Sequence, residues 1–314
     1  MLPLWWAFVA SCMVRMRGIM KNQTSTAKYG KITFVLFTLP ALFFYTMIWG
    51  VNFVSGLYYS LTDWNGLTSN YNMVGLSNYI RIFKSDRIFS SLQITFQYAL
   101  ILVTFTMLIS LLLALALNKK IRALTFFRSV FFFPAMISLV TASLIFDKIF
   151  FYVLPKIGQL LHLDMLSNNL LAMPDTALYG VLIVNIWQAV AIPTVLFIAG
   201  LQSVPNELYE SAALDGAGNI KSFFSITLPY IIPVLSVNLV LSFKAGITVF
   251  DYILILTDGG PAGKTEVVSM LIYSHGFGSF RFGYANAEAV ILFVIIAVVS
   301  LIQITFLNKK GVAS

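Results

Sequence analysis

Long apolar runs are the feature that most restricts how this chain can fold. Crossing the roughly 30 Å hydrocarbon core of a membrane takes about 20 consecutive apolar residues. Backbone amides inside lipid must pair within the chain, so such runs fold only as helices or closed barrels, and none here shows the alternation of a strand. We therefore predict an all-α integral membrane protein with about six transmembrane helices, at residues 33–59, 92–117, 126–147, 177–200, 226–250 and 289–307.

Composition and charge exclude several other classes of protein. Of the 314 residues 59% are hydrophobic and 10% charged, whereas soluble domains carry about 25% charged residues. The net charge of +8 does not indicate nucleic-acid binding, because the basic residues lie between apolar runs instead of on one polar domain. A single cysteine, Cys12, excludes an internal disulfide, and two distant histidines, His162 and His275, predict no metal site.

The distribution of Lys and Arg predicts the orientation of the chain. With the N-terminus inside, the cytoplasmic segments hold twelve of these residues and the outer loops seven, while Lys244 falls within a span. Basic residues are enriched on the cytoplasmic side of membrane proteins. We therefore expect both termini in the cytoplasm, as an even number of spans requires.

Residues 1–32 are predicted to form a cytoplasmic N-terminal segment ahead of a permease domain at 33–314. Leu2–Val14 is apolar but too short to span, and its basic residues follow it, the reverse of a signal peptide. Two interpretations of residues 1–19 stay open: an interfacial helix, or a start codon assigned too early, with Met20 as the true start.

The loop between the fourth and fifth predicted spans differs from the other connections. Residues 205–216 are predicted to form a helix of about ten residues, with Pro205 in its first turn and Glu207 and Glu210 complementing its positive N-terminus. Gly216 can adopt the left-handed conformation that ends a helix. A helix this short depends on tertiary contacts for its stability.

The surface of this predicted helix suits docking to another protein. Leu208 with Ala212, and Tyr209 with Ala213, form apolar pairs four residues apart, and the small alanines allow a partner to approach the backbone. An apolar helix face laid in a groove is a common recognition mode. The alternative is a solvated helix that only connects two spans.

The sequence from Glu210 to Ala217, followed by Phe223, Ile226 and Leu228-Pro229, resembles the EAA motif of ATP-binding-cassette (ABC) importer permeases. In that family the motif forms the coupling helix, which lies in a groove of the cytoplasmic ATPase. Ser211 departs from the usual alanine but is small enough to fit. The resemblance implies a type I ABC importer permease fold and an ATPase contact made by Glu210, Ser211, Ala212, Ala213, Asp215 and Gly216.

Three further segments are similar to carbohydrate permeases of this family: 60–66 (SLTDWNG), 74–79 (VGLSNY) and 257–261 (TDGGP). They resemble the maltose-type first subunit, with a family core at about 90–307. The resemblance implies an oligosaccharide or related substrate and a bacterial inner-membrane location. It also implies four partners: a second homologous permease, two copies of an ABC ATPase, and an extracytoplasmic sugar-binding protein.

The segment 259–265 (GGPAGKT) looks like a phosphate-binding loop but is not predicted to be one. Its spacing from Gly259 to Lys264 is one residue short, and Asp258 stands where the motif needs glycine. We expect no ATPase motif, no catalytic residue and no bound cofactor in this chain. ATP and Mg²⁺ would be used by the partner ATPase.

Polar residues within two spans are candidates for the substrate pathway. Sugar binding needs directional hydrogen bonds and apolar or aromatic surfaces. A charge such as Lys244 inside a span is costly and marks a functional candidate, although a lysine snorkelling to an interface is the alternative. Asp251 is expected on the same face, about 10 Å away at 1.5 Å per residue. The candidates are Asn185, Trp187, Gln188, Ser242, Lys244, Gly246, Val249 and Asp251, of which the resemblance implies Asn185, Gln188, Ser242 and Val249.

The sequence disfavours two other classes of function. An ion-coupled secondary transporter often carries inverted repeats and carboxylates at the membrane midplane, and neither is evident here: no acid is expected deep within a span. A membrane enzyme would need a catalytic cluster. Neither alternative accounts for the loop at 205–216.

Overall fold

The computed structural model describes residues 27–118, 124–163 and 167–311, so the two interpretations of residues 1–19 lie outside the described residues. Within those ranges the chain is helical, with one isolated bridge between Thr62 and Met73, and the all-α prediction is confirmed. Short π-helical turns and one 3₁₀ turn carry η labels. The elements are α2 (Ala27–Tyr45), η2 (Thr46–Gly50), α3 (Val51–Tyr59), α4 (Ser77–Ile82), α5 (Asp86–Leu117), α6 (Leu124–Met136), α7 (Leu139–Lys148), η3 (Ile149–Val153), α8 (Leu154–Leu160), η5 (Leu170–Ala172), α9 (Ala177–Ala189), α10 (Ala191–Gln202), α11 (Asn206–Leu214), α12 (Asn219–Ser222), η6 (Phe223–Thr227), α13 (Leu228–Ile247), α14 (Asp251–Leu256), α15 (Val268–Tyr273), η7 (Ser274–Gly278) and α16 (Phe282–Gly311).

Among the described residues, four continuous helical stretches are long and apolar enough to cross a membrane: Thr33–Tyr59, Asp86–Leu117, Asn219–Ile247 and Phe282–Thr305. Two bent pairs of helices raise the number to six if each pair is one span. The six-span prediction agrees with this larger number. The observed second and last spans begin six to seven residues before the predicted starts at 92 and 289, because their first turns are less apolar than their centres.

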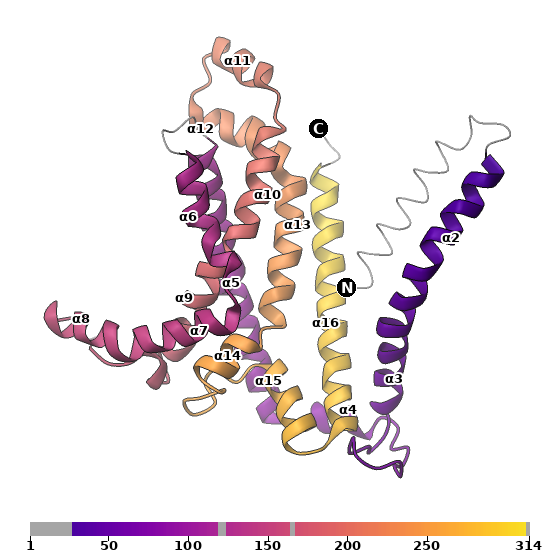
Figure 1. The fold of residues 1–314 in the computed structure, drawn as a ribbon. Coiled ribbons are helices and arrows are strands. Elements are labelled where there is room, and N and C mark those ends of the chain that lie inside the picture. The colour runs from indigo at the N-terminus through magenta and orange to yellow at the C-terminus, as the bar shows by residue number, and fades with distance from the viewer. Residues whose placement is uncertain (1–26, 119–123, 164–166, 312–314) are drawn as a thin grey trace.

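The third predicted span, 126–147, is wrong as a single straight helix. Phe126–Met136 and Leu139–Leu160 meet at 97°. Pro134 has no N–H for the preceding turn and tends to kink a helix, and Ser138 takes an extended conformation, with φ −56° and ψ 134°. After the break, α7 and α8 run sideways from the bundle (Figure 1).

The fourth predicted span, 177–200, is also bent, by 42° between α9 and α10. Pro193 lies in the first turn of α10, where its missing N–H leaves the carbonyl of Ala189 without its usual helical donor. The bend is shallower than the one before α7, since helical dihedral angles continue through Val190.

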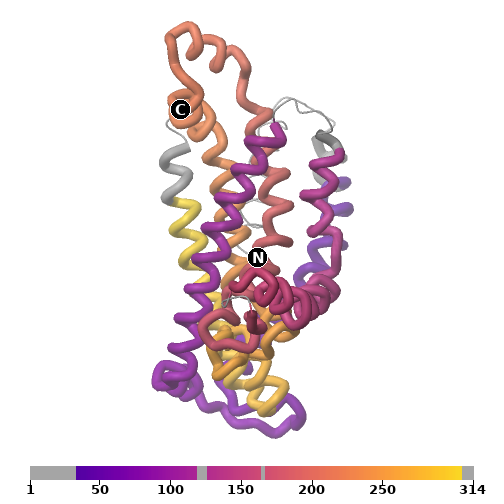
Figure 2. Tube along the Cα trace, turned by 90° about the vertical axis from the view of Figure 1, so that its left-hand side faces the viewer, coloured from indigo at the N-terminus to yellow at the C-terminus, as the bar shows by residue number. Residues whose placement is uncertain are grey.

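The centre of the bundle is built around α5. This helix packs along α13 and α10, and α13 also packs along α16, as the side-by-side tubes in Figure 2 show. Tyr98 and Leu102 of α5, Val181 and Leu182 of α9, and Ile253 of α14 are buried in one apolar cluster. Because many other large apolar side chains face outward, the bundle suits a lipid surrounding.

The first span stands apart from this bundle. In Figure 1, α2 leans away from the other helices, and no residue in its most apolar window is buried. Its continuation, α3, docks on α16 through a ring contact between Phe53 and Phe293, with centroids 5.0 Å apart.

The two ends of the bundle differ. α11 and α12 project from one end, where α2 also begins and α16 ends, whereas α4, α14 and α15 lie at the other (Figure 1). At that second end, Arg87 at the start of α5 forms an ion pair with Glu266, with N and O atoms 2.6 Å apart. We call these the α11 end and the α15 end.

Candidate functional site

The helix expected at 205–216 is present as α11, Asn206–Leu214. Pro205 precedes the helix in an extended conformation, with φ −62° and ψ 134°, so its predicted place inside the first turn is off by one residue. Glu207 lies in the first turn as expected. Gly216 is left-handed, with φ +75°, and the N–H of Ala217 donates to the Ala212 carbonyl at 2.8 Å. This closure is the glycine-terminated helix end predicted from the sequence.

Solvent surrounds most of α11, which has no buried residue. Leu214 is 91% exposed, an unusual position for leucine in a folded chain. Of the predicted contact residues, Ala212 is half-buried, whereas Glu210, Ser211, Ala213, Asp215 and Gly216 are exposed.

One hydrogen bond fastens this exposed helix to the bundle. The hydroxyls of Tyr209 and Thr227 lie 2.8 Å apart, and Thr227 is the last residue before α13. The predicted pair of Tyr209 with Ala213 therefore does not form one outward face, because Tyr209 turns inward. The outward apolar surface comes instead from Leu208 and Leu214.

The side chain of Gln188 is engaged inside the protein. Its Nε2 donates to the carbonyls of Pro134 at 3.1 Å and Ile137 at 2.6 Å, and its Oε1 accepts from the Tyr252 hydroxyl at 2.6 Å. Burial, followed by the charge of Asp251, raises the pKa of Tyr252 to about 12, so this hydroxyl keeps its proton at neutral pH. Gln188 thus joins α9, the break before α7, and α14.

Asn185 and Trp187 differ in how accessible their side chains are to a ligand. Asn185 is buried and donates to the Tyr98 hydroxyl at 2.8 Å. Trp187 is 38% exposed and packs against Phe146 with ring centroids 5.1 Å apart. Of these two, Trp187 has the surface to contact a ligand.

The candidates on α13 occupy three settings. Ser242 is buried. Lys244 lies in the last turn, because the helix ends at Ile247 instead of near 250, so it sits close to the end of its span. A lysine there complements the negative helix C-terminus. A Cβ on Gly246 would lie 2.8 Å from Cα of Ala99, so this glycine serves the close approach of α13 to α5.

Val249 and Asp251 follow a break in the backbone. Phe250 has φ −144° and ψ −60°, so helical spacing does not relate Asp251 to Lys244, and the expected shared face is wrong. Val249 is buried in the apolar cluster around Tyr98, and Asp251 is exposed in the first turn of α14.

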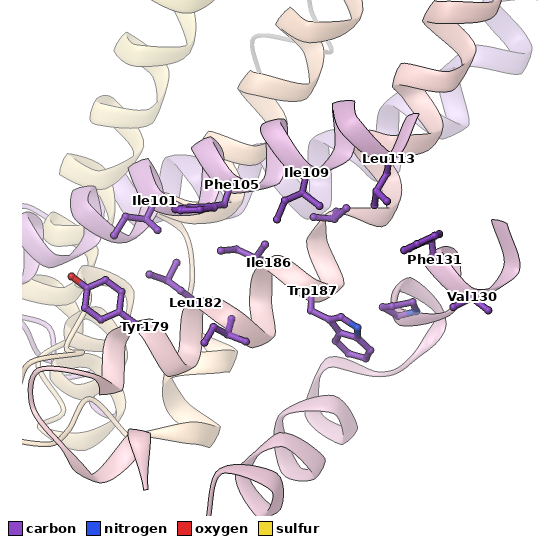
Figure 3. Close-up of a pocket in the computed structure, with 13 residues that line it drawn as sticks. Ile101, Phe105, Ile109, Leu113, Val130, Phe131, Tyr179, Leu182, Ile186 and Trp187 are labelled. Atoms are coloured by element: carbon purple, nitrogen blue, oxygen red, sulfur yellow. The ribbon is translucent and has the colours of Figure 1, made fainter. Parts of the chain in front are cut away.

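An apolar cleft of about 630 Å³ lies between α5, α6 and α9 (Figure 3). Trp187 is the one sequence candidate that lines it. Phe105 and Ile109 form its α5 wall, and Tyr179 and Ile186 part of its α9 wall. The cleft offers apolar and aromatic surface with few polar groups.

A buried pair of ionisable residues was missed by the sequence analysis. Glu288 is 3% exposed, and its carboxylate oxygens lie 2.9 and 3.0 Å from Nδ1 of His275. Because α16 begins at Phe282, Glu288 lies in its second turn, near the end of the span and one residue before the predicted start at 289. The two residues are thirteen positions apart on separate elements, a spacing that leaves no periodic signal.

Comparison with known proteins now decides the family. A family model described as the binding-protein-dependent transport system inner membrane component matches residues 107–310. The chain belongs to this family. It is therefore a permease subunit of an ABC transporter, and the ion-coupled alternative is rejected.

Individual relatives agree along most of the chain. The multiple sugar-binding transport system permease protein MsmF of Streptococcus mutans is 41% identical, over 90% of this chain and 96% of that protein. The trehalose/maltose transport system permease protein MalF of Thermococcus litoralis is 30% identical, over 71% of this chain and 76% of that protein.

Solved structures support the fold. A chain of a bacterial ABC transporter for the acidic polysaccharide alginate aligns with a TM-score of 0.76 at 21% identity, over 91% of this chain and 99% of that chain. The alginate transporter in complex with a periplasmic protein bound to alginate pentasaccharide gives 0.78 at 22% identity, over 90% and 97%. The predicted importer-permease fold is confirmed.

Proposed function

We propose that this chain is one of two permeases in an ABC sugar importer and forms half of the path for an oligosaccharide or related carbohydrate. The relatives described above, named for sugar transport, support the substrate class. The observation that carries the coupling role is α11: a short helix, projecting from one end of the bundle, with a 91% exposed leucine.

In this proposal α11 is the contact with the cytoplasmic ATPase. Glu210, Ser211, Ala212, Ala213, Asp215 and Gly216 surround the exposed Leu214, and they leave the backbone accessible to a close-fitting groove. Movement of α11 would reach the membrane through the Tyr209–Thr227 hydrogen bond at the base of α13. ATP and Mg²⁺ belong to the ATPase, and this chain binds neither.

The proposed assembly contains a second homologous permease, two ATPase copies and an extracytoplasmic sugar-binding protein. The first span supports the second permease, since none of the residues in its most apolar window is buried in this chain. In a bacterial inner membrane the α11 end would face the cytoplasm. The Lys and Arg distribution supports this, as do α2 and α16, which begin and end at that side.

Within the membrane, Trp187 is the strongest of the predicted substrate contacts because it lines the apolar cleft. Asn185 and Gln188 would act through the residues they hold, and Gly246 and Val249 through packing. Ser242, Lys244 and Asp251 stay candidates, and transport assays of their variants would show which of them contact substrate.

The test is ATP-driven uptake of sugar by the complete complex in proteoliposomes. Leu214→Asp should lower uptake about tenfold or more, the effect of losing an apolar interface anchor worth about 1.4 kcal/mol or more. Leu67→Asp, at a 71% exposed leucine of the opposite end, is the matched control and should behave as wild type.

A second variant, Gly216→Pro, tests the same helix through its backbone, because proline cannot adopt φ +75°. Complex assembly is followed by size-exclusion chromatography. Wild-type uptake by an assembled Leu214→Asp complex refutes the coupling role. Sugar transport by the purified chain without ATPase subunits refutes the importer.

A further inference from the structure

One row of side chains on α5 changes from polar to apolar along the helix. Gln93, Gln97, Ile101, Phe105 and Ile109 recur every four residues and therefore form one ridge of the helix. The ridge carries amides near the α15 end and apolar side chains toward the α11 end. Tyr98, next to Gln97, points about 100° round the helix from it and is fully buried.

The amide end of this ridge faces a hollow of its own. A groove of about 470 Å³ lies where α5, the start of α9 and the loop before α15 meet. Unlike the apolar cleft, it is lined largely by hydrogen-bonding groups. Its polar residues are Ser90, Gln93, Gln97, Asp175, Tyr179 and Lys264.

The two hollows meet at Tyr179, which lines both and which Figure 3 places opposite Ile101. The α5 ridge continues from one into the other. Together they make a groove that begins with polar groups at the α15 end and becomes apolar inside the bundle.

The position of Gln97 argues that this face meets water and not lipid. At 1.5 Å per residue, the 32 residues of α5 extend about 48 Å, roughly 18 Å more than the hydrocarbon core. If α5 is centred in the membrane, hydrocarbon begins about 9 Å from the start of the helix. Gln97 lies about 16 Å from that start, and so about 7 Å inside the hydrocarbon. A primary amide facing lipid without a partner is costly. In the described part of the chain, the exposed amides of Gln93 and Gln97 have no hydrogen-bond partner.

We propose that this groove is the carbohydrate path of the subunit, an inference that rests on the proposed function. Gln93 and Gln97 would hydrogen-bond sugar hydroxyls at the mouth, since an amide both donates and accepts. Tyr179 and Phe105 would supply surfaces for the apolar faces of the rings. Asp175 and Lys264 have opposite charges at neutral pH, so the mouth suits an uncharged oligosaccharide.

The first test asks whether water reaches the α5 ridge in the assembled transporter. In a Cys12→Ser background, Gln97→Cys is exposed to a membrane-impermeant methanethiosulfonate reagent in proteoliposomes, both at rest and trapped with ATP and vanadate. Phe96→Cys, at a 40% exposed phenylalanine about 100° round the helix from Gln97 and at the same depth, is the control. Labelling of Gln97→Cys but not Phe96→Cys in at least one state supports the path. Absence of Gln97→Cys labelling in both states overturns it.

The second test is uptake of radiolabelled maltotriose and raffinose, both neutral. Gln97→Leu and Gln93→Leu should each lower uptake at least about fivefold through a lost hydroxyl contact, with assembly of the complex unchanged. Gln159→Leu, on exposed α8 away from the groove, should match wild type. If wild type transports sugar and all three variants equal it, the groove is not the path and the importer stands. If wild type transports neither sugar, the proposed function itself fails.

Discussion

Gln188→Leu gives a direct test of what this amide does. The substitution keeps the side-chain volume nearly constant and removes three hydrogen bonds, to the carbonyls of Pro134 and Ile137 and from the hydroxyl of Tyr252. Hydrogen bonds between helices in membrane proteins average about 0.6 kcal/mol. Three of them give about 2 kcal/mol. Freeing the Ile137 carbonyl at the break before α7 adds to this cost, whereas the Pro134 carbonyl keeps the Ile137 N–H as a donor at 3.3 Å.

Tyr252→Phe removes one of these bonds and should cost less than 1 kcal/mol. The double variant Gln188→Leu/Tyr252→Phe should then show a coupling energy of about 0.6 kcal/mol, the contribution of the shared bond. Equilibrium unfolding in mixed micelles with increasing SDS measures all three variants against wild type.

The outcome separates a structural from a substrate-contacting role for Gln188. We expect Gln188→Leu to lower the unfolding free energy. Unchanged stability together with a raised KM for sugar uptake would refute this reasoning. In that case Gln188 would contact substrate, as the sequence comparison implied.

Two further predictions concern packing and pH. Gly246→Ala should lower the unfolding free energy by about 1–2 kcal/mol, because the new Cβ would meet the backbone of α5 at 2.8 Å. Gly278→Ala is the control and should leave the unfolding free energy unchanged, because its nearest neighbour would be 3.8 Å away. Both variants are measured by SDS unfolding. The N–H and side-chain amide of Asn72 lower the pKa of Asp63, so their stabilisation of the loop between α3 and α4 is complete above the ordinary pKa of aspartate and is lost as pH falls through the lowered value. Hydrogen exchange of the Asn72 amide should accelerate relative to the intrinsic rate over that range, and Asp63→Asn should abolish the change.

The local chemistry of α11 could be predicted from sequence because it depends on neighbouring residues. Proline is disfavoured in the middle of a helix, so Pro205 is expected near the start of one, and Gly216 tolerates a positive φ at little cost. These restrictions act within a few residues, so they hold whatever the rest of the chain does. The observed helix begins only one residue later than predicted.

The direction of side chains inside the spans could not be predicted in the same way. A helix that is apolar all round shows no face to orient it, so nothing in the sequence marked Gly246 as packed on Ala99 or Val249 as buried. The break before α7 was hidden for a similar reason. Pro134 predicts a kink, but the 97° turn depends on distant partners, among them Gln188.

The contact between α3 and α16 has a consequence for the synthesis of this protein. Phe53 meets Phe293, so the first span docks on the last. At roughly 5–20 residues per second, a ribosome needs about 10–50 s to cover the 240 residues between them. During that time the first span waits in lipid without its docking site in the chain. A nascent chain that stops before α16 therefore leaves the first span without the contact that docks it in the finished protein.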